Sequence, residues 1–400
     1  MISVNRSQRI ILNEACNYGV ELCPLKTANG RILQEDIRSD RDQPPFNKAL
    51  MDGIAVSFNV WKRGQRQFLI EGTMPAGEPP LKIKRKDSCV KIMTGAVLPS
   101  GLDCIIPVEF VTMQNGFARI SIELKIERGQ NIRFKGEDQR KGKIVLKKGT
   151  MLNVPQVGIC ASVGIAKIKV SRLPKIAVIA TGDELVEINE PIKFFQTRLS
   201  NSYALTALFD ESRLACARAF HLPDKKNILA RDIKKILAEF DICVLSGGVS
   251  MGEFDYVPSI LNDLGVRKLF HKVSQKPGKP FWFGKSRVGK IVFALPGNSV
   301  STLICAYRYV VVFLKKSLGV KKSGVQKVLM VSPVKARSDL TSFVPVKLKY
   351  DNTVPSAHVV SGGGSGDWSA LAQTDGFIEL PPGKNLLKGQ EVNYYSWRVG

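Results

Sequence analysis

Three short polar loops that contain glycine follow apolar runs rich in β-branched residues. The loops are Thr181-Gly182, Ser246-Gly247-Gly248 and Pro296-Gly297-Asn298. If the runs before them are parallel strands, the loops meet at one edge of a sheet, where backbone amides and helix N-termini can bind phosphate or oxyanion groups. One Gly-Gly turn is usually only a turn, but three such loops at one edge predict a pocket for an anionic ligand.

Carboxylates lie beside these loops. Asp183 and Glu184 follow the first loop, Asp224 precedes a predicted helix, and Asp255 comes just after the segment Ser246–Gly252. Carboxylates next to phosphate-binding loops commonly hold Mg²⁺ together with water and phosphate oxygens, which makes Asp224 and Asp255 candidate ligands. A purely structural interpretation is also open, in which Asp224 caps a helix and Asp183 stabilises a turn.

Two lysines on one rigid turn supply the opposite charge. The segment Lys276-Pro277-Gly278-Lys279-Pro280 holds two ammonium groups close together, and they repel each other unless an anion joins them. The segment therefore predicts an anionic substrate, with a solvated basic turn as the alternative.

Regular elements between about residues 175 and 318 must position these side chains. Apolar runs at 176–180, 242–245 and 291–295 predict buried strands. Apolar residues at helical spacing predict helices over about 201–209 and 229–240, and one long helix over 300–314. Strands that alternate with helices indicate a parallel, doubly wound α/β sheet.

The flanking segments have a different pattern. Short β-like runs broken by Gly and Pro between about 43 and 138 predict a compact β-rich module. The segment 140–172 is typical of an elongated or linker-like element. Beyond residue 326, four alternating segments predict a small β-barrel or sandwich.

Composition excludes several classes of protein. The chain has 400 residues, 44% of them hydrophobic, as in an ordinary globular protein of several domains. We expect no membrane-spanning helix and no secretory signal, and hence a cytoplasmic protein. The eight cysteines form no C-x-x-C pair, and none of the three histidines lies in a nucleophile context. Zinc-site and Ser-His-Asp chemistry are therefore not expected.

The net charge of +24 has two interpretations. Nucleic acid or a small oxyanion could be the partner, or the lysines could form solvated basic faces. No basic run is interleaved with stacking aromatics, so nucleic acid is not the expected partner. Affinity that falls steeply with salt for every nucleic-acid sequence would identify it instead.

An ordered series of motifs extends over nearly the whole chain. The motifs are Pro44-Pro45-Phe46 with Met51-Asp52-Gly53, Lys91-Ile92-Met93-Thr94-Gly95-Ala96, Gly136-Glu137-Asp138, Thr181-Gly182-Asp183-Glu184-Leu185, Ser246-Gly247-Gly248-Val249-Ser250-Met251-Gly252, Lys276-Pro277-Gly278-Lys279-Pro280 and Leu295-Pro296-Gly297-Asn298. In this order they resemble the molybdopterin molybdenumtransferases, the MoeA family, which includes the gephyrin E domain.

This resemblance implies an elongated homodimer of four-domain subunits. The doubly wound, MogA-like α/β domain would comprise residues 1–21 and 171–325, and a linker domain 22–42 and 140–170. A β-rich domain would comprise 43–139, and a C-terminal β-barrel 326–400. The active site would lie between the α/β domain of one subunit and the β-rich domain of the other.

The resemblance also implies a reaction and its residues. Molybdenum from molybdate would enter adenylylated molybdopterin with release of AMP and in the presence of Mg²⁺. The implied catalytic residues are Asp52, Thr94, Asp138 and Glu184. Implied substrate-binding residues are Thr181, Gly182, Ser246, Gly247, Gly248, Pro296, Gly297 and Asn298. Molybdate would bind to Ser250, Lys276 and Lys279, and Mg²⁺ to Asp224 and Asp255.

Three positions depart from the family pattern. The chain has Ala49 where Ser is common, Ile54 where an aromatic is common, and Ser299 where Pro usually follows Pro-Gly-Asn. None of them removes a proposed charged ligand, so we expect an active enzyme. The chain carries no fused adenylyltransferase domain, so a separate molybdopterin adenylyltransferase is expected to supply the substrate. The alternative function is a non-catalytic scaffold that binds partner proteins.

Overall fold

The computed structural model describes residues 1–121, 124–249, 256–320, 324–350 and 354–398. The predictions for Ser250 and Asp255 lie outside these residues. The chain forms two compact units. One comprises Met1–Glu35, Lys148–Val157 and Lys167–Gly400, and the other Asp36–Lys147 and Gly158–Ala166.

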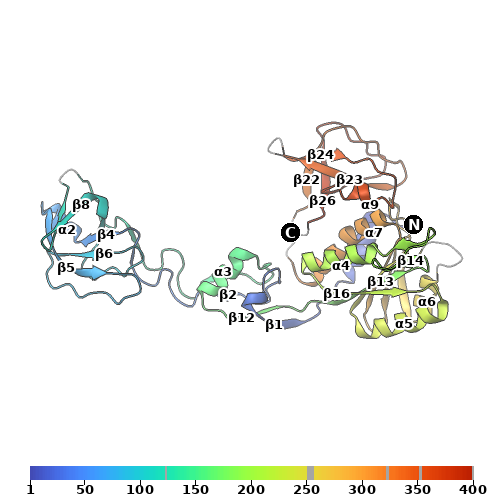
Figure 1. Ribbon diagram of the computed structural model, residues 1–400, viewed down its shortest axis with the longest axis horizontal. Helices are drawn as coiled ribbons and strands as arrows, with labels where there is room; N and C mark the ends of the chain where they lie inside the picture. Colours follow the sequence, from blue (N-terminus) through green and yellow to red (C-terminus); the bar gives the residue numbers. More distant parts are fainter. Residues whose placement is uncertain (122–123, 250–255, 321–323, 351–353, 399–400) are drawn as a thin grey trace. The chain divides into compact units, whose positions relative to one another are not determined.

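A six-stranded sheet forms the centre of the first unit (Figure 1). In spatial order its strands are β16 (Cys216–Leu222), β13 (Lys175–Thr181), β17 (Ile242–Ser246), β21 (Ile291–Leu295), β20 (Trp282–Ser286) and β18 (Val266–His271). The first four strands are parallel, and β20 and β18 are added at one edge through antiparallel pairings, of β20 with β21 and of β18 with β20. The three strands predicted from apolar runs are therefore confirmed, within a sheet that is mixed rather than wholly parallel.

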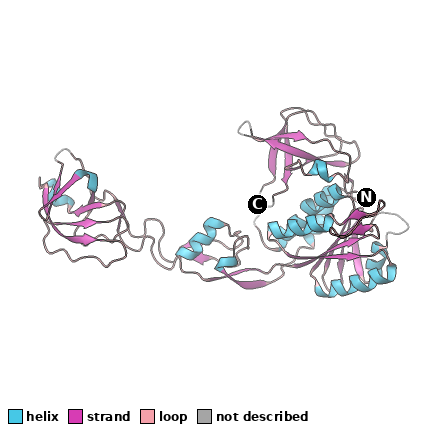
Figure 2. Ribbon diagram, in the orientation of Figure 1, coloured by secondary structure: helices cyan, strands magenta, loops and turns pink. Residues whose placement is uncertain are grey.

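Helices cover both faces of this sheet (Figures 1 and 2). One face carries α1 (Val4–Asn13), α4 (Asn201–Ser212), α7 (Ser299–Cys305) and α8 (Val312–Ser317), and the other carries α5 (Lys226–Glu239) and α6 (Val257–Asp263). Because successive strand residues point to opposite faces, Ile176 and Val178 pack in the first core while Ala177 and Ile179 pack in the second. This arrangement is the predicted doubly wound fold.

The predicted long helix over 300–314 is interrupted. A π-helical turn, Ala306–Val311, separates α7 from α8. Two residues of this wider turn make buried polar contacts. Tyr309 donates its hydroxyl to Gln275 Oε1 at 2.5 Å, and Arg308 Nε donates to Glu379 Oε2 at 2.8 Å. Helical spacing alone does not distinguish an α-helix with such a π insertion from a regular one.

A closed five-stranded barrel lies near the C-terminus of the first unit. Its strands are β23 (Thr341–Lys349), β24 (Ser356–Val359), β22 (Gln326–Met330), β26 (Glu391–Ser396) and β25 (Gly376–Leu380), and pairing of β25 with β23 closes it. The sequence pattern predicts four of these strands and misses β24, which has only four residues. The short helix α9 (Trp368–Leu371) precedes β25, and β19 (Gln275–Lys276) adds to β23 in parallel.

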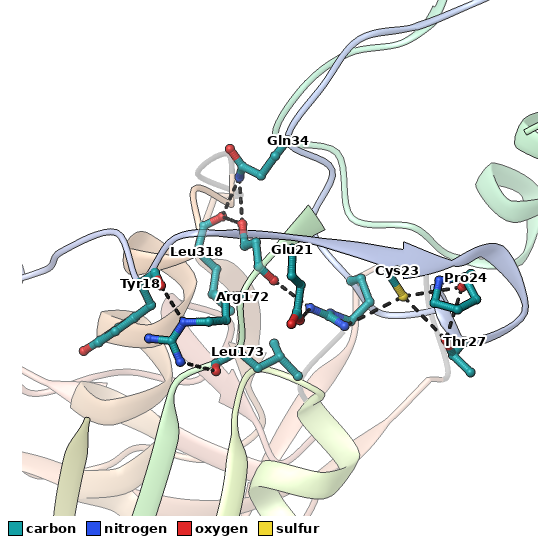
Figure 3. Close-up of polar contacts among 11 residues, drawn as sticks. Tyr18, Glu21, Cys23, Pro24, Thr27, Gln34, Arg172, Leu173 and Leu318 are labelled. Atoms are coloured by element: carbon teal, nitrogen blue, oxygen red, sulfur yellow. Dashed lines mark hydrogen bonds and ion pairs between the residues drawn. The ribbon is translucent and has the colours of Figure 1, made fainter. Parts of the chain in front are cut away.

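An antiparallel pair, β1 (Val20–Pro24) and β12 (Lys167–Ser171), precedes the α/β sheet, with the 3₁₀ turn η1 (Leu25–Thr27) after β1. Figure 3 shows how side chains hold this pair to the end of α8. Gln34 donates to the hydroxyl of Ser171 at 2.7 Å, and that hydroxyl donates to the carbonyl of Leu318 at 2.7 Å. Arg31 pairs with Glu21 beside the same strands.

The second unit is β-rich, as its short β-like runs broken by Gly and Pro predict. Its sheet has the order β7 (Cys104–Pro107), β4 (Gly53–Val56), β6 (Cys89–Ile92), β5 (Gln67–Met74), β9 (Phe117–Ile120) and β8 (Val111–Gln114). Two small pairs accompany it, β3 (Lys48–Ala49) with β10 (Ile132–Arg133) and β2 (Ile37–Arg38) with β11 (Ile144–Leu146), as do α2 (Phe58–Lys62) and the 3₁₀ turn η2 (Val108–Phe110). Helix α3 (Val154–Ser162) spans the boundary between the units.

Two of the departures from the family pattern lie in the core of the second unit. Ile54 is fully buried in β4, and Ala49 is 1% exposed in β3. Both side chains pack against other apolar groups, so these replacements act on packing. Among the described residues, no helix is long and apolar enough to cross a membrane, and all eight cysteines are described and unpaired.

Candidate functional site

The predicted loops meet at the carboxyl edge of the four parallel strands. The Gly182 amide donates to the carbonyl of Leu222 at 3.4 Å, and the Gly247 amide donates to that of Leu295 at 3.3 Å. Each of these bonds joins the end of one strand to the end of its neighbour. The loops after β13, β16, β17 and β21 therefore form one continuous rim.

The rim requires glycine for steric reasons. Gly247 has φ +104°, and a Cβ there would lie 2.8 Å from the carbonyl oxygen of Thr181. A Cβ on Gly248, at φ +65°, would lie 2.9 Å from Thr181 Oγ1. Thr181 itself is 4% exposed, and its hydroxyl has no hydrogen-bond partner in the described part of the chain. The backbone is thus packed closely around the buried hydroxyl of Thr181, which leaves no room for a side chain at these two glycines.

Asn201 links two of the loops, although the sequence pattern indicates for it only a helix start. Its Nδ2 donates to the carbonyl of Gly297 at 2.6 Å and to Ser246 Oγ at 2.9 Å. Thr302 Oγ1 adds a bond to the carbonyl of Pro296 at 2.5 Å. Two side chains from α4 and α7 therefore fix the position of Pro296-Gly297-Asn298 relative to the β17 loop. The only sequence signal for Asn201 is its position at the start of a helix beside the sheet.

The acidic residues of the rim lie close together. The Asp224 amide donates to Asp183 Oδ1 at 3.0 Å, which brings the ends of β13 and β16 together. His221 Nε2 lies 3.0 Å from the carbonyl oxygen of Gly182. Asp224 is not the N-cap of α5, because Lys225 occupies that position without a side-chain bond. The capping interpretation of Asp224 is therefore wrong.

Glu184 is exposed next to this pair. Its carbonyl accepts from the Thr197 amide at 2.8 Å, where a short parallel pair forms between β14 (Leu185–Val186) and β15 (Thr197–Arg198). The exposed carboxylates of Asp183 and Glu184 and the half-buried one of Asp224 are hard oxygen donors of the kind that Mg²⁺ prefers. The described residues contain no group of three potential metal ligands.

The lysine turn is held by buried groups. Gln275 is fully buried; its side chain accepts from Tyr309 and donates to the carbonyl of Gly278 at 3.2 Å. Gly278 has φ +94°, and a Cβ there would meet Gln275 Nε2 at 2.5 Å. Lys276 and Lys279 are both exposed on this rigid turn. The anchor keeps the two ammonium groups on a fixed backbone.

A cavity of about 310 Å³ lies beside Lys276. Its walls come from the lysine turn, the first turn of α7, strand β23 and the segment before α9, and they include Lys276, Val300, Phe343, Pro345, Ser365 and Asp367. The sequence motifs do not indicate that one further segment lines this cavity, Ser361-Gly362-Gly363-Gly364-Ser365-Gly366-Asp367. Its glycine content is the only sequence signal for it.

In the second unit the structure brings Asp52 and Thr94 together. Asp52 Oδ1 accepts from the amide of Thr94 at 2.6 Å and from its hydroxyl at 2.8 Å. These two donors, the amide first, hold the pKa of Asp52 below its usual range because they stabilise the charged carboxylate. The pair is exposed, so it is available to a partner or substrate.

Asp138 belongs to a different contact in the same unit. Arg133 binds its Oδ1 through both Nε, at 2.8 Å, and Nη2. Among the described residues no hydrogen bond connects Asp138 with Asp52 or Thr94. Of the three predicted catalytic residues of this unit, Asp52 and Thr94 thus form one hydrogen-bonded pair, and Asp138 forms a separate ion pair with Arg133.

Three family models match successive parts of the chain. Residues 2–164 match the MoeA N-terminal region (domain I and II), 177–316 a probable molybdopterin binding domain, and 327–397 the MoeA C-terminal region (domain IV). With the glycine rim and the C-terminal barrel, these matches define a multidomain α/β protein of the molybdenum cofactor biosynthesis class.

Individual relatives agree with this class. The chain is 36% identical to a molybdopterin molybdenumtransferase of Synechocystis, over 99% of this chain and 100% of the relative. It is 33% identical to a gephyrin of Dictyostelium discoideum, over 82% of this chain and 51% of that protein. A MoeA structure from Pyrococcus horikoshii has a TM-score of 0.83 at 26% identity and covers 99% of this chain and 100% of that one. The chain belongs to the MoeA family of molybdopterin molybdenumtransferases.

Proposed function

We propose that this chain inserts molybdenum from molybdate into adenylylated molybdopterin and releases AMP. The supporting observation is the rim, where three glycine loops and the Asp183–Asp224 contact lie at one sheet edge. Backbone amides there suit the phosphates of the substrate, and the exposed Lys276 and Lys279 are the cations proposed to bind a small oxyanion. The proposal places the reaction in the cytoplasm, where a separate adenylyltransferase supplies the substrate.

Each group on the rim has a proposed task. Thr181, Gly182, Ser246, Gly247, Gly248, Pro296, Gly297 and Asn298 bind and orient the phosphate-bearing substrate. Lys276 and Lys279, together with Ser250, attract the molybdate dianion. Glu184 orients the water that attacks the phosphoanhydride, which separates AMP from the pterin phosphate.

Asp224 and Asp255 would hold Mg²⁺. The hard oxygen donors at the ends of β13 and β16 fit this ion. When bound, Mg²⁺ neutralises phosphate charge and makes AMP a better leaving group. Asp224→Asn should therefore abolish turnover, whereas the matched change Asp263→Asn, at an exposed position on α6, should leave it unchanged.

A second subunit completes the site in this proposal. Asp52, Thr94 and Asp138 lie on the β-rich unit, and the proposal assigns their catalytic roles to a site shared with the rim of a partner copy. The supporting observation is the exposure of the Asp52–Thr94 pair. The four domain ranges expected from the sequence, 1–21 with 171–325, 22–42 with 140–170, 43–139 and 326–400, belong to this proposal.

The decisive experiment uses purified protein, adenylylated molybdopterin, molybdate and Mg²⁺, and measures AMP release and cofactor formation. No turnover by a folded protein would refute the enzyme and favour a non-catalytic scaffold. Mixing Thr94→Ala protein with Lys276→Ala protein tests the shared site. Mixed dimers should regain activity because one of their two sites is intact; if the mixture stays inactive, the two residues act within one chain.

A further inference from the structure

The segment 361–367, called here the glycine loop, joins the barrel to the rim of the α/β sheet. The carbonyl of Ser365 accepts from the amide of Val300 at 2.9 Å, and Ser365 Oγ accepts from Asn298 Nδ2 at 2.8 Å. Trp368, just after the loop, donates its indole N–H to Ser200 Oγ at 3.0 Å. Three hydrogen bonds thus connect the loop and α9 with the starts of α7 and α4.

One carboxylate shapes this loop. Asp367 Oδ2 accepts from the amide of Gly363 at 2.7 Å, and its Oδ1 accepts from the amide of Ala370 at 3.0 Å. The Ala370 amide and then the Gly363 amide lower the pKa of Asp367, because both bonds stabilise the charged form. The same side chain therefore caps α9 and closes the turn that carries Ser365.

The loop also fits closely around that carboxylate. A Cβ on Gly362 would lie 2.8 Å from the Cβ of Ala370 and 3.2 Å from Asp367 Oδ2. Gly364 has φ +117°, a conformation that side chains rarely adopt. The backbone can follow this path only with glycine at these positions, so the loop has one preferred shape.

The shape of the glycine loop affects Asn298 and the cavity beside Lys276. Asn298 belongs to the loop that Asn201 and Thr302 hold from the α/β side, and Ser365 holds it from the barrel side. Both Ser365 and Asp367 line the cavity beside Lys276. The width of that cavity therefore depends on how the glycine loop is bound to Asn298 and Val300.

We propose that Asp367 is a positioning residue that fixes the glycine loop, and that the Ser365–Asn298 bond sets the geometry of the cavity beside Lys276, where the oxyanion would approach. This inference rests on the proposed function for the identity of the oxyanion, and it gives Asn298 a structural partner within the chain. Asp367 itself does not bind the oxyanion, because like charges repel. It acts through the loop that it closes.

Two variants test the inference by hydrogen exchange, which does not depend on activity. In Asp367→Asn, amide N–H groups replace one acceptor, and the turn at Gly363 opens. We expect the Val300 amide to exchange about fivefold faster, as for the loss of a bond worth about 1 kcal/mol. Asp263→Asn and Ser369→Ala, at exposed side chains, are the matched controls. Unchanged protection of Val300 in Asp367→Asn would overturn the proposal.

Kinetics then separate positioning from a general loss of stability. Asp367→Asn should raise the KM for molybdate about tenfold and change kcat much less, because a looser cavity weakens binding. Ser365→Ala and Asn298→Ala should each weaken molybdate binding, and the double variant should be no weaker than the worse single one, since both remove the same bond. Additive effects of Ser365→Ala and Asn298→Ala on molybdate binding contradict the inference. Equal losses of kcat and of the active fraction in Asp367→Asn also contradict it. An inactive wild-type protein refutes the proposed function instead, and the exchange result still decides the positioning role.

Discussion

A buried ion pair between the π-helical turn and the barrel gives the sharpest stability prediction. Arg308 Nε donates to Glu379 Oε2 at 2.8 Å, and the two side chains are 4% and 12% exposed. The hydroxyl of Tyr395 donates to the same carboxylate oxygen at 2.8 Å. Glu379→Gln keeps the shape and an acceptor for Tyr395 but leaves the Arg308 charge without its counter-ion.

The expected loss follows from the burial of the pair. Removing one partner of a buried ion pair costs about 3–5 kcal/mol, because the remaining charge stays desolvated. The exposed pair of Lys327 and Glu391, with side chains 59% and 52% exposed, should contribute at most about 1 kcal/mol. Glu391→Gln in the same barrel is therefore the matched control.

Urea unfolding followed by tryptophan fluorescence measures both variants. Trp368 and Trp397 pack against the core that joins the barrel to the sheet, so they report on this contact. The double variant Arg308→Met/Glu379→Gln should regain much of the loss, because no buried charge remains. If Glu379→Gln is no less stable than Glu391→Gln, the pair does not anchor the barrel, and the reasoning is wrong.

Three further predictions concern the site itself. Asn201→Ala should lower kcat/KM about 30-fold, since two hydrogen bonds of about 1 kcal/mol each are lost. Asn227→Ala, at an exposed position, should leave kcat/KM unchanged. Equal values of kcat/KM for the two variants would show that the bridge between loops is unimportant. Gly247→Ala should lower the unfolding free energy by about 1–2 kcal/mol more than Gly289→Ala does. Both glycines have positive φ, but only a Cβ at Gly247 would meet a carbonyl oxygen, at 2.8 Å. Similar losses of free energy in urea unfolding would argue against the close approach. Thr94→Val should raise the pKa of Asp52 toward its ordinary value, because the hydroxyl donor that stabilises the carboxylate is gone. In an NMR titration the Asp52 carboxylate should therefore become protonated at higher pH. An unchanged titration would mean that the bond from the Thr94 amide alone sets this pKa.

The local order of residues explains why much of this protein can be predicted. Buried strands need continuous apolar runs, so the runs before Thr181, Ser246 and Pro296 indicate both the strands and the loops that follow them. Parallel strands must end at one edge, so the apolar pattern by itself implies that those loops lie together. The lysine turn and the carboxylates are also evident, because their charge is a property of the residues themselves.

Packing decides which distant side chains meet. Asn298 and Ser365 are 67 positions apart, and Arg308 and Glu379 are 71 apart. No periodicity connects such pairs, since their contact depends on how the barrel packs against α7 and the π-helical turn. The antiparallel edge strands and the bridge made by Asn201 likewise depend on packing between segments far apart in the sequence. The buried parallel strands, the loops that follow them and the charges of this MoeA family member thus follow from its residue order. The bonds that hold those loops in one geometry arise only in the folded chain, because a hydrogen bond needs two partners within about 3 Å.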